Sequence, residues 1–176
     1  MSKRFSFAWV ALAIIALVAA DQLTKAYVNA HLVLGDEHPV IPGLLNFTFV
    51  RNQGAAWGIL QGWHLALAFL AIAMLVVLAV FRKRIFGSGR LATMVFVLLF
   101  AGIAGNFIDR VFLGYVVDFI DFFHGAWHFP AFNIADSCIC VGVFLYMFRA
   151  FFPQPGTTSE AGAAEQPSSQ TREKTK

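Results

Sequence analysis

The stretch LATMVFVLLFAGIAGNFI, residues 91–108, decides the fold class because it contains no charged side chain from end to end. Its length is close to the roughly 20 residues that a helix needs to cross the hydrocarbon core of a bilayer. Three further apolar stretches occupy about residues 5–28, 63–81 and 134–152. The sequence therefore predicts an all-α membrane protein with four transmembrane helices.

The composition of the chain agrees with this class. Hydrophobic residues make up 59% of the 176 positions and charged residues only 13%, whereas soluble domains are about half apolar and a quarter charged. The net charge of +3 would favour a nucleic-acid partner in a soluble chain. Here the basic residues flank apolar stretches and no nucleotide motif is present, so we expect a membrane lipid environment and no nucleic-acid partner.

The basic residues predict the orientation, because loops on the cytoplasmic side carry an excess of Lys and Arg. Ten of the 13 basic residues precede the first stretch, fill the loop between the second and third, or follow the start of the fourth. The other three, Lys25, Arg51 and Arg110, fall on the opposite side. Both termini are therefore expected in the cytoplasm, with the connections after the first and third helices on the outer side of the membrane.

The first stretch has an alternative interpretation as a cleavable signal peptide. It has a positive start, a short apolar core and the small-residue ending Leu17-Val18-Ala19-Ala20. Its removal would leave three spans and would put the basic loop and the basic tail on opposite faces. The distribution of positive charge disfavours that arrangement.

The remaining segments suggest one membrane domain over residues 1–153 with two additions. Residues 154–176 are polar and hold no aromatic side chain, so we expect a disordered cytoplasmic tail. Residues 35–62 contain Pro39, Pro42 and Gly43, followed by LNFTFVR at 45–51, where apolar and polar positions roughly alternate. This pattern predicts a small strand or hairpin on the outer membrane surface.

With this topology, the carboxylates collect at one depth. Asp21, Asp109 and Asp136 are expected at the outer ends of their helices, and Asp118 and Asp121 in the outer connection between the third and fourth. Spacings of three or four residues give the three helical aspartates a polar neighbour on the same helix face: Asp21 with Lys25, Asn106 with Asp109 and Arg110, and Asn133 with Asp136. They are either interfacial charges and helix caps or parts of a functional site.

Five short blocks resemble the lipoprotein signal peptidase (signal peptidase II) family. In order along the chain they are Asp21-Gln22-x-x-Lys25, Arg51-Asn52-x-Gly54-Ala55-Ala56, Gly105-Asn106-x-x-Asp109-Arg110, Val116-Val117-Asp118-Phe119 and Phe132-Asn133-x-Ala135-Asp136. The chain departs from the family at Trp57-Gly58, where Phe-Ser is common.

The resemblance implies an inner-membrane aspartic endopeptidase with four transmembrane helices. Such an enzyme cleaves diacylglyceryl-modified prolipoproteins just before the lipidated cysteine, at the periplasmic face. The catalytic aspartates map by motif onto Asp118 and Asp136. The other block residues would have supporting or substrate-binding roles: Asp21, Lys25, Asn52, Gly54, Asn106, Asp109, Arg110, Asn133 and Ala135. We expect no cofactor and a monomer.

The proposed chemistry suits two close carboxylates. One takes a proton from a water molecule and the other protonates the substrate, because like charge and partial burial push their pKa values apart. Arg110 is a candidate to neutralise Asp109, and Asp21 with Lys25 a candidate structural pair. A metal site remains an alternative, since His124 and His128 lie close in sequence to Asp118 and Asp121. Catalytic zinc, however, is usually held by three protein ligands in a defined geometry.

Two other classes of function remain open. A small proton-coupled transporter would also place carboxylates in a helical bundle, although it would favour charges near the bilayer midplane. A non-catalytic membrane assembly factor would tolerate the loss of Asp118 or Asp136.

Overall fold

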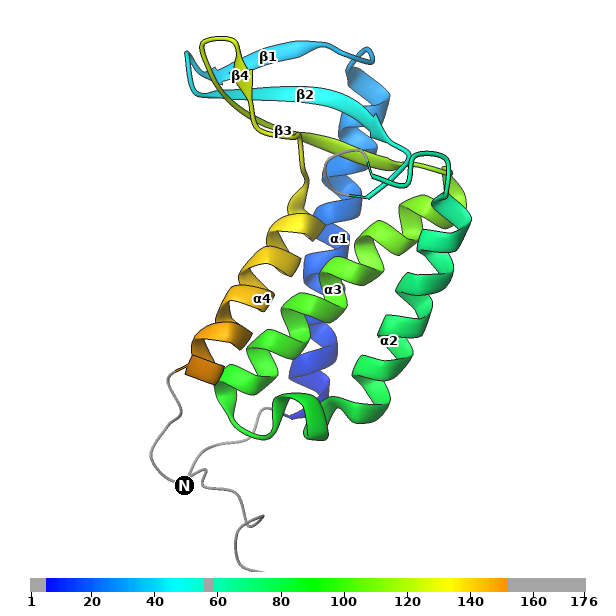
Figure 1. The fold of residues 1–176 in the computed structure, drawn as a ribbon, viewed down its shortest axis with the longest axis vertical. Coiled ribbons are helices and arrows are strands. Elements are labelled where there is room, and N and C mark those ends of the chain that lie inside the picture. The colour runs from blue at the N-terminus through cyan, green and yellow to red at the C-terminus, as the bar shows by residue number, and fades with distance from the viewer. Residues whose placement is uncertain (1–5, 56–58, 152–176) are drawn as a thin grey trace, which may run out of the picture.

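The computed structural model describes residues 6–55 and 59–151. Four helices, α1 (Phe7–His31), α2 (His64–Phe86), α3 (Arg90–Phe112) and α4 (Ile134–Phe151), form a bundle with a small sheet at one end (Figure 1). All four are long and apolar enough to cross a membrane, which confirms the four helices expected from the sequence. The predicted tail at 154–176 and the Trp57-Gly58 departure lie outside the described residues.

Helix α3 lies at the centre of the bundle and packs against α1, α2 and α4. At the end away from the sheet, Phe86, Val95 and Phe96 form an apolar cluster with Val10 and Leu78. Near the sheet, small residues bring α3 close to its neighbours: a Cβ built on Gly105 would lie 2.6 Å from the Asp21 carboxylate. Small residues at such positions allow membrane helices to approach closely.

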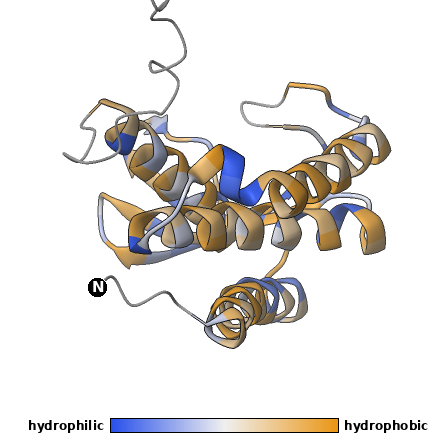
Figure 2. Cartoon of the chain, turned by 90° about the horizontal axis from the view of Figure 1, so that it is seen from below, coloured by the Kyte–Doolittle hydropathy of each residue, from blue (hydrophilic) through white to orange (hydrophobic). Residues whose placement is uncertain are grey.

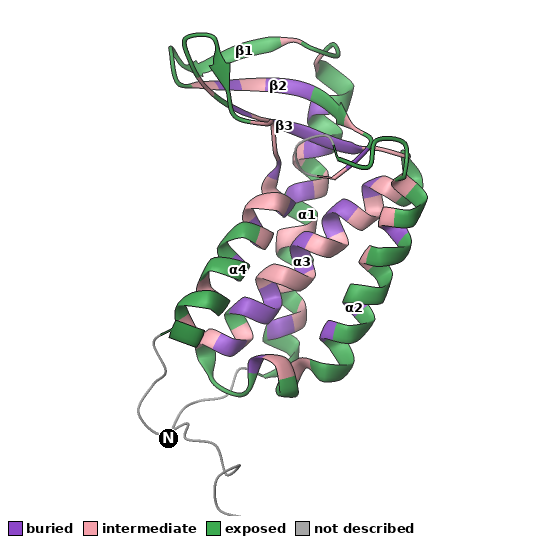
Figure 3. Ribbon diagram, in the orientation of Figure 1, coloured by how far each residue is buried: buried purple, intermediate pink, exposed green. Residues whose placement is uncertain are grey.

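The outer faces of the helices carry the apolar side chains that the bundle does not bury. Leu23 is 71% exposed, Phe69 73% and Phe144 66%. The helices are mainly hydrophobic along their length (Figure 2), and their outward faces are largely exposed (Figure 3). Exposed apolar surface on this scale is unfavourable in water but suits contact with lipid.

The sheet has four antiparallel strands in the order β1 (Glu37–Ile41), β2 (Leu45–Asn52), β3 (Val116–His124) and β4 (Trp127–His128). The strand-containing segment expected between the first two helices is confirmed as β1 and β2. Strands β3 and β4 were not expected, because this segment was predicted to be a connection between the third and fourth helices. The reason is that aspartates three apart in a run of apolar residues do not give the two-residue alternation of a half-buried strand.

Helix α1 continues past Asp21 and supports the sheet. Its end at His31 lies close to the expected end at about residue 28, but Asp21, expected at the outer end of the helix, lies well inside it. The turns after Asp21 bury Val28 against Phe49, Val117 and Phe119 of the sheet. Burial of these apolar side chains favours continuation of the helix beyond the bundle.

Candidate active site

Asp118 and Asp136 lie together where the sheet meets the bundle. Asp118 is on β3 and is only 2% exposed, while Asp136 is half-buried in the first turn of α4. Each of the four carboxylate oxygens accepts a hydrogen bond. Asp118 accepts from the side chains of Asn133 (2.7 Å) and Asn52 (3.0 Å). Asp136 accepts from the side chain of Asn106 (2.7 Å) and the backbone N–H of Asn133 (3.2 Å).

Asn133 orients Asp136 by capping α4. Its side-chain oxygen accepts the backbone N–H of Asp136 at 2.9 Å, while the Asp136 carboxylate accepts the backbone N–H of Asn133. This reciprocal pair is a capping box, which satisfies backbone donors that the first helical turn leaves free. The capping roles considered for these two residues are therefore present, and Asn133 contacts Asp118 with the same side chain.

The local geometry of β2 places Asn52 beside Asp118. Asn52 is opposite Val116 in the sheet, and Val50 is opposite Asp118, so Asn52 and Asp118 are diagonal neighbours. A bulge between Phe47 and Val50 shifts the register directly before this point. Bulges commonly re-aim a side chain near a site, and here the shift gives Asp118 its second amide donor.

Burial has an electrostatic consequence for Asp118. Desolvation, together with the negative charge of Asp136, raises the pKa of Asp118 from 3.8 to about 7. Hydrogen bonds from Asn52 and Asn133 and the charge of Lys25 act in the opposite direction but do not cancel the effect. Asp118 is therefore protonated in a large fraction of molecules at neutral pH, as a proton donor in acid–base catalysis requires.

Arg110 and Gly54 connect the site to the loop that follows β2. Arg110 donates to the Gly54 carbonyl at 3.1 Å and to the Asn106 carbonyl at 3.3 Å. The N–H of Gly54 donates to the Asn52 side chain at 3.0 Å. A side chain at position 54 would collide with the backbone of Ile59, so only glycine fits there.

Lys25 organises the polar residues behind the aspartate pair. Its ammonium lies 2.8 Å from Asp21 and 3.1 Å from Asp109, and it donates to Asn106 at 3.0 Å. Asp109 thus forms its ion pair with Lys25, and Arg110, which was expected to neutralise it, interacts only electrostatically with its charge. Gln22, which sequence reasoning did not single out, donates to both Asp21 (3.1 Å) and Asp109 (2.9 Å). The sequence feature that could have identified Gln22 is its position in the block Asp21-Gln22-x-x-Lys25.

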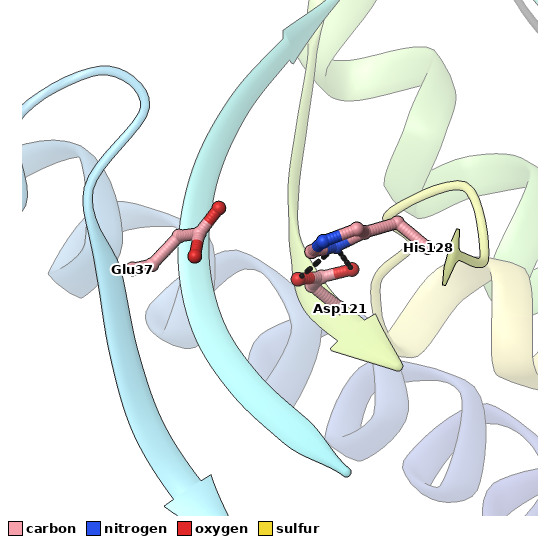
Figure 4. Close-up of side chains that lie close together, drawn as sticks. All are labelled: Glu37, Asp121 and His128. Carbon is pink, nitrogen blue, oxygen red and sulfur yellow. Dashed lines mark hydrogen bonds and ion pairs between the residues drawn. The ribbon is translucent and has the colours of Figure 1, made fainter. Parts of the chain in front are cut away.

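Asp121 belongs to a separate cluster on the sheet (Figure 4). It lies within 3.1 Å of the His128 imidazole and accepts from Asn46 at 3.3 Å. Glu37 also accepts from Asn46, at 3.4 Å. Of the described residues, Glu37, Asp121 and His128 form the group that could hold a metal ion. Asp118 and His124 are not part of it, so the four-residue metal site considered from the sequence does not assemble.

The geometry of the aspartate pair limits the chemistry it can perform. Two carboxyl groups, one of them with a pKa near neutrality, can hold a single proton between them and exchange it with a reacting group. Their hydrogen-bond partners are amides that fix both carboxyls in place. The pair is suited to activating water for hydrolysis.

Comparisons with known proteins match this chain to one family. A family model described as signal peptidase (SPase) II matches residues 13–152. The lipoprotein signal peptidase of Bacillus pumilus is 42% identical over 133 residues, covering 76% of this chain and 86% of the relative. That of Photorhabdus laumondii is 38% identical over 158 residues, covering 88% and 93%. A solved structure described as a bacterial membrane enzyme superposes with a TM-score of 0.77 at 38% identity, covering 91% of this chain and 97% of that one.

Proposed function

The chain belongs to the signal peptidase II family of lipoprotein signal peptidases, and from this premise we propose that it is an aspartic endopeptidase with Asp118 and Asp136 as its catalytic pair. Its substrates are prolipoproteins modified with diacylglyceryl, and it cleaves the peptide bond before the lipidated cysteine. The observation that carries this proposal is a buried carboxyl with a raised pKa beside a second carboxyl, with amide donors on all four oxygens.

In the proposed mechanism Asp136 acts as the base and Asp118 as the acid. Asp136 lies in the first turn of α4 and accepts a backbone N–H, and these two contacts each stabilise negative charge on its carboxylate. It removes a proton from water, and the resulting hydroxide attacks the scissile carbonyl carbon while Asp118 gives its proton to the carbonyl oxygen. Collapse of the tetrahedral intermediate breaks the C–N bond: Asp136 gives its proton to the departing cysteine amine, and Asp118 takes a proton back from a hydroxyl group of the new carboxyl group. No metal or cofactor enters this scheme.

The proposed setting is the cell inner membrane, with both termini in the cytoplasm and the sheet and catalytic pair at the periplasmic face. Residues 1–153 form the membrane peptidase domain, residues 154–176 form a cytoplasmic tail, and the protein acts as a monomer. The excess of basic residues on one side of the helices supports this orientation. The site would then meet a substrate whose lipid is in the bilayer and whose scissile bond is near the surface.

The experiment that tests the function is cleavage of a purified lipidated precursor by the purified protein. We expect Asp118→Asn and Asp136→Asn each to abolish cleavage, because an amide cannot exchange the required proton. Asp121→Asn is the matched control, since it removes a buried aspartate of the same strand that lies in the separate cluster. Wild-type turnover in either site variant would exclude that residue, and a wild type without cleavage would favour the transporter or assembly-factor interpretation.

A further inference from the structure

Lys25 is a buried cation whose three donor positions are all used inside the protein. The residue is 2% exposed, and its ammonium contacts Asp21, Asp109 and Asn106. A lysine ammonium has three hydrogens and no acceptor. A buried charge requires such partners because desolvation is otherwise too costly. Lys25 therefore has no donor left for a substrate, and any role in catalysis must act through its partners.

The two carboxylates that Lys25 binds each hold the backbone directly before a catalytic aspartate. Asp21 accepts the N–H of Ala135 at 2.9 Å, one residue before Asp136. Asp109 accepts the N–H of Val117 at 3.0 Å, one residue before Asp118. The Lys25 ammonium is thus linked to the start of α4 through Asp21 and to the start of β3 through Asp109.

Lys25 also determines how Asn106 faces the pair. Because an ammonium can only donate, the side-chain oxygen of Asn106 must face Lys25, and its NH2 group is turned toward Asp136. The same oxygen accepts from Asn133 at 3.2 Å, and Asn133 in turn donates to Asp118 at 2.7 Å. One lysine therefore governs hydrogen bonds that reach both carboxyl groups.

The surrounding residues are shaped to keep Asp21 in this position. Gly105 has no side chain, and an added Cβ would lie 2.6 Å from Asp21 and 3.1 Å from the Ala135 Cβ. Gln22 donates to the Asp21 carboxylate and to the Gly105 carbonyl, each at 3.1 Å. Both residues therefore border the Asp21 carboxylate, which indicates that this space is built around the Lys25 ion pairs.

We propose that Lys25 is a positioning residue that sets the relative placement of Asp118 and Asp136 through Asp21, Asp109 and Asn106. The inference rests on the proposed function only in assigning the chemistry to that pair. A lysine that merely stabilises the fold would lower the amount of folded enzyme. A positioning lysine also changes the turnover and the proton affinity of the enzyme that remains folded.

The charges around Asp118 give the direction of that change. Asp118 is faced by Asp136 from α4, by Lys25 from α1 and by Arg110 from α3. The positive charge of Lys25 lowers the pKa of Asp118. Loss of the ammonium, with Asp21 and Asp109 still present, removes this opposition, so the pKa of Asp118 rises above about 7.

The test is Lys25→Met in the full-length protein, with Lys83→Met as a matched control at the far end of α2. Asp118 is titrated by the NMR signal of its labelled side-chain carbon, identified by its loss in Asp118→Asn. Lys25→Met should move this titration to higher pH. It should also lower kcat by about tenfold to a hundredfold per folded molecule, with little change in KM, because small misplacements of reacting groups are costly. The control should change neither quantity.

A second variant covers the case in which Lys25→Met does not fold. Asp21→Asn keeps an oxygen for the Ala135 N–H but removes the negative charge that pairs with Lys25. It should lower kcat in the same manner and move the Asp118 titration to lower pH. An unchanged Asp118 titration in a folded variant would overturn the positioning role, whatever the activity. A wild type that titrates as expected but does not cleave the precursor would reject the proposed function instead.

Discussion

At the scale of single residues, Asp118 is a carboxyl group that folding removes from water, and the energetic penalty of this burial depends on pH. In the unfolded chain its pKa is 3.8, and in the folded protein it is about 7. Below about pH 4 both states bind the proton and there is no penalty. As the pH rises toward 7 the unfolded state ionises first, so the free energy of unfolding falls, by roughly 1.4 kcal/mol for each pKa unit of difference.

Asp118→Asn should remove this pH dependence. Relative to the wild type, the melting temperature of the variant in detergent should rise between about pH 4 and 7 and should then stay level, because above that range Asp118 is ionised in both states. Any hydrogen bond lost between the new amide and Asn52 or Asn133 adds an offset that does not vary with pH. A difference in melting temperature that is constant from pH 4 to 8 would contradict the raised pKa.

The sequence indicated which residues gather, but not which pairs form. Asp21, Lys25, Asn106 and Asp109 were expected near one another because helix spacing and motif order place them at one depth. Arg110 was expected to neutralise Asp109, but the ion pair of Asp109 forms with Lys25, because the choice between these two cations depends on how α1 packs on α3. Such packing angles come from tertiary contacts that no local pattern encodes.

At the scale of elements, the helices were easier to predict than the strands. A continuous apolar run long enough to cross a bilayer has few other stable conformations, so all four helices were expected. Strand β3 was missed because Asp118 and Asp121, three residues apart, belong to different polar clusters. The pairing between β2 and β3 is also a long-range contact. Its register depends on a bulge in β2 that has no recognisable pattern in the sequence.

The cluster formed by β1, β3 and β4 gives a prediction about metal. Because a carboxylate pair needs no cation, strong chelators should leave the rate of precursor cleavage unchanged. The matched variant is His128→Ala, which removes the imidazole of the one candidate metal group among the described residues. Loss of cleavage on chelation, with recovery on adding zinc in the wild type but not in His128→Ala, would make Glu37, Asp121 and His128 part of the activity.

At the scale of the whole molecule, the orientation in the membrane determines which compartment the aspartate pair faces. The first helix starts and the fourth helix ends at the same end of the bundle, and the sheet with the aspartate pair is at the other (Figure 1). Most of the basic residues that the structure describes lie at the first of these ends, namely Arg82, Lys83, Arg84, Arg90 and Arg149. The fold shows that the two ends of the bundle differ in structure. The distribution of positive charge predicts which of them faces the cytoplasm.

Truncation after Pro153 should leave cleavage nearly unchanged, because residues 154–176 offer no candidate catalytic group. A reporter fused at Lys176 should be found in the cytoplasm. An outward-facing reporter would put the aspartate pair on the cytoplasmic side, out of reach of an exported precursor. A large loss of activity on truncation would show that the tail acts in substrate binding or folding.

The central claim is that Asp118 and Asp136 act as one unit, and the measurement that tests it most directly is the cleavage rate of the double variant Asp118→Asn/Asp136→Asn beside the two single variants. Residues of one catalytic unit are strongly non-additive, because loss of either already removes the shared function. We therefore expect the double variant to cleave the lipidated precursor no more slowly than the slower single variant. Losses that multiply, with measurable cleavage in each single variant, would show that the two aspartates contribute independently and do not act as one unit.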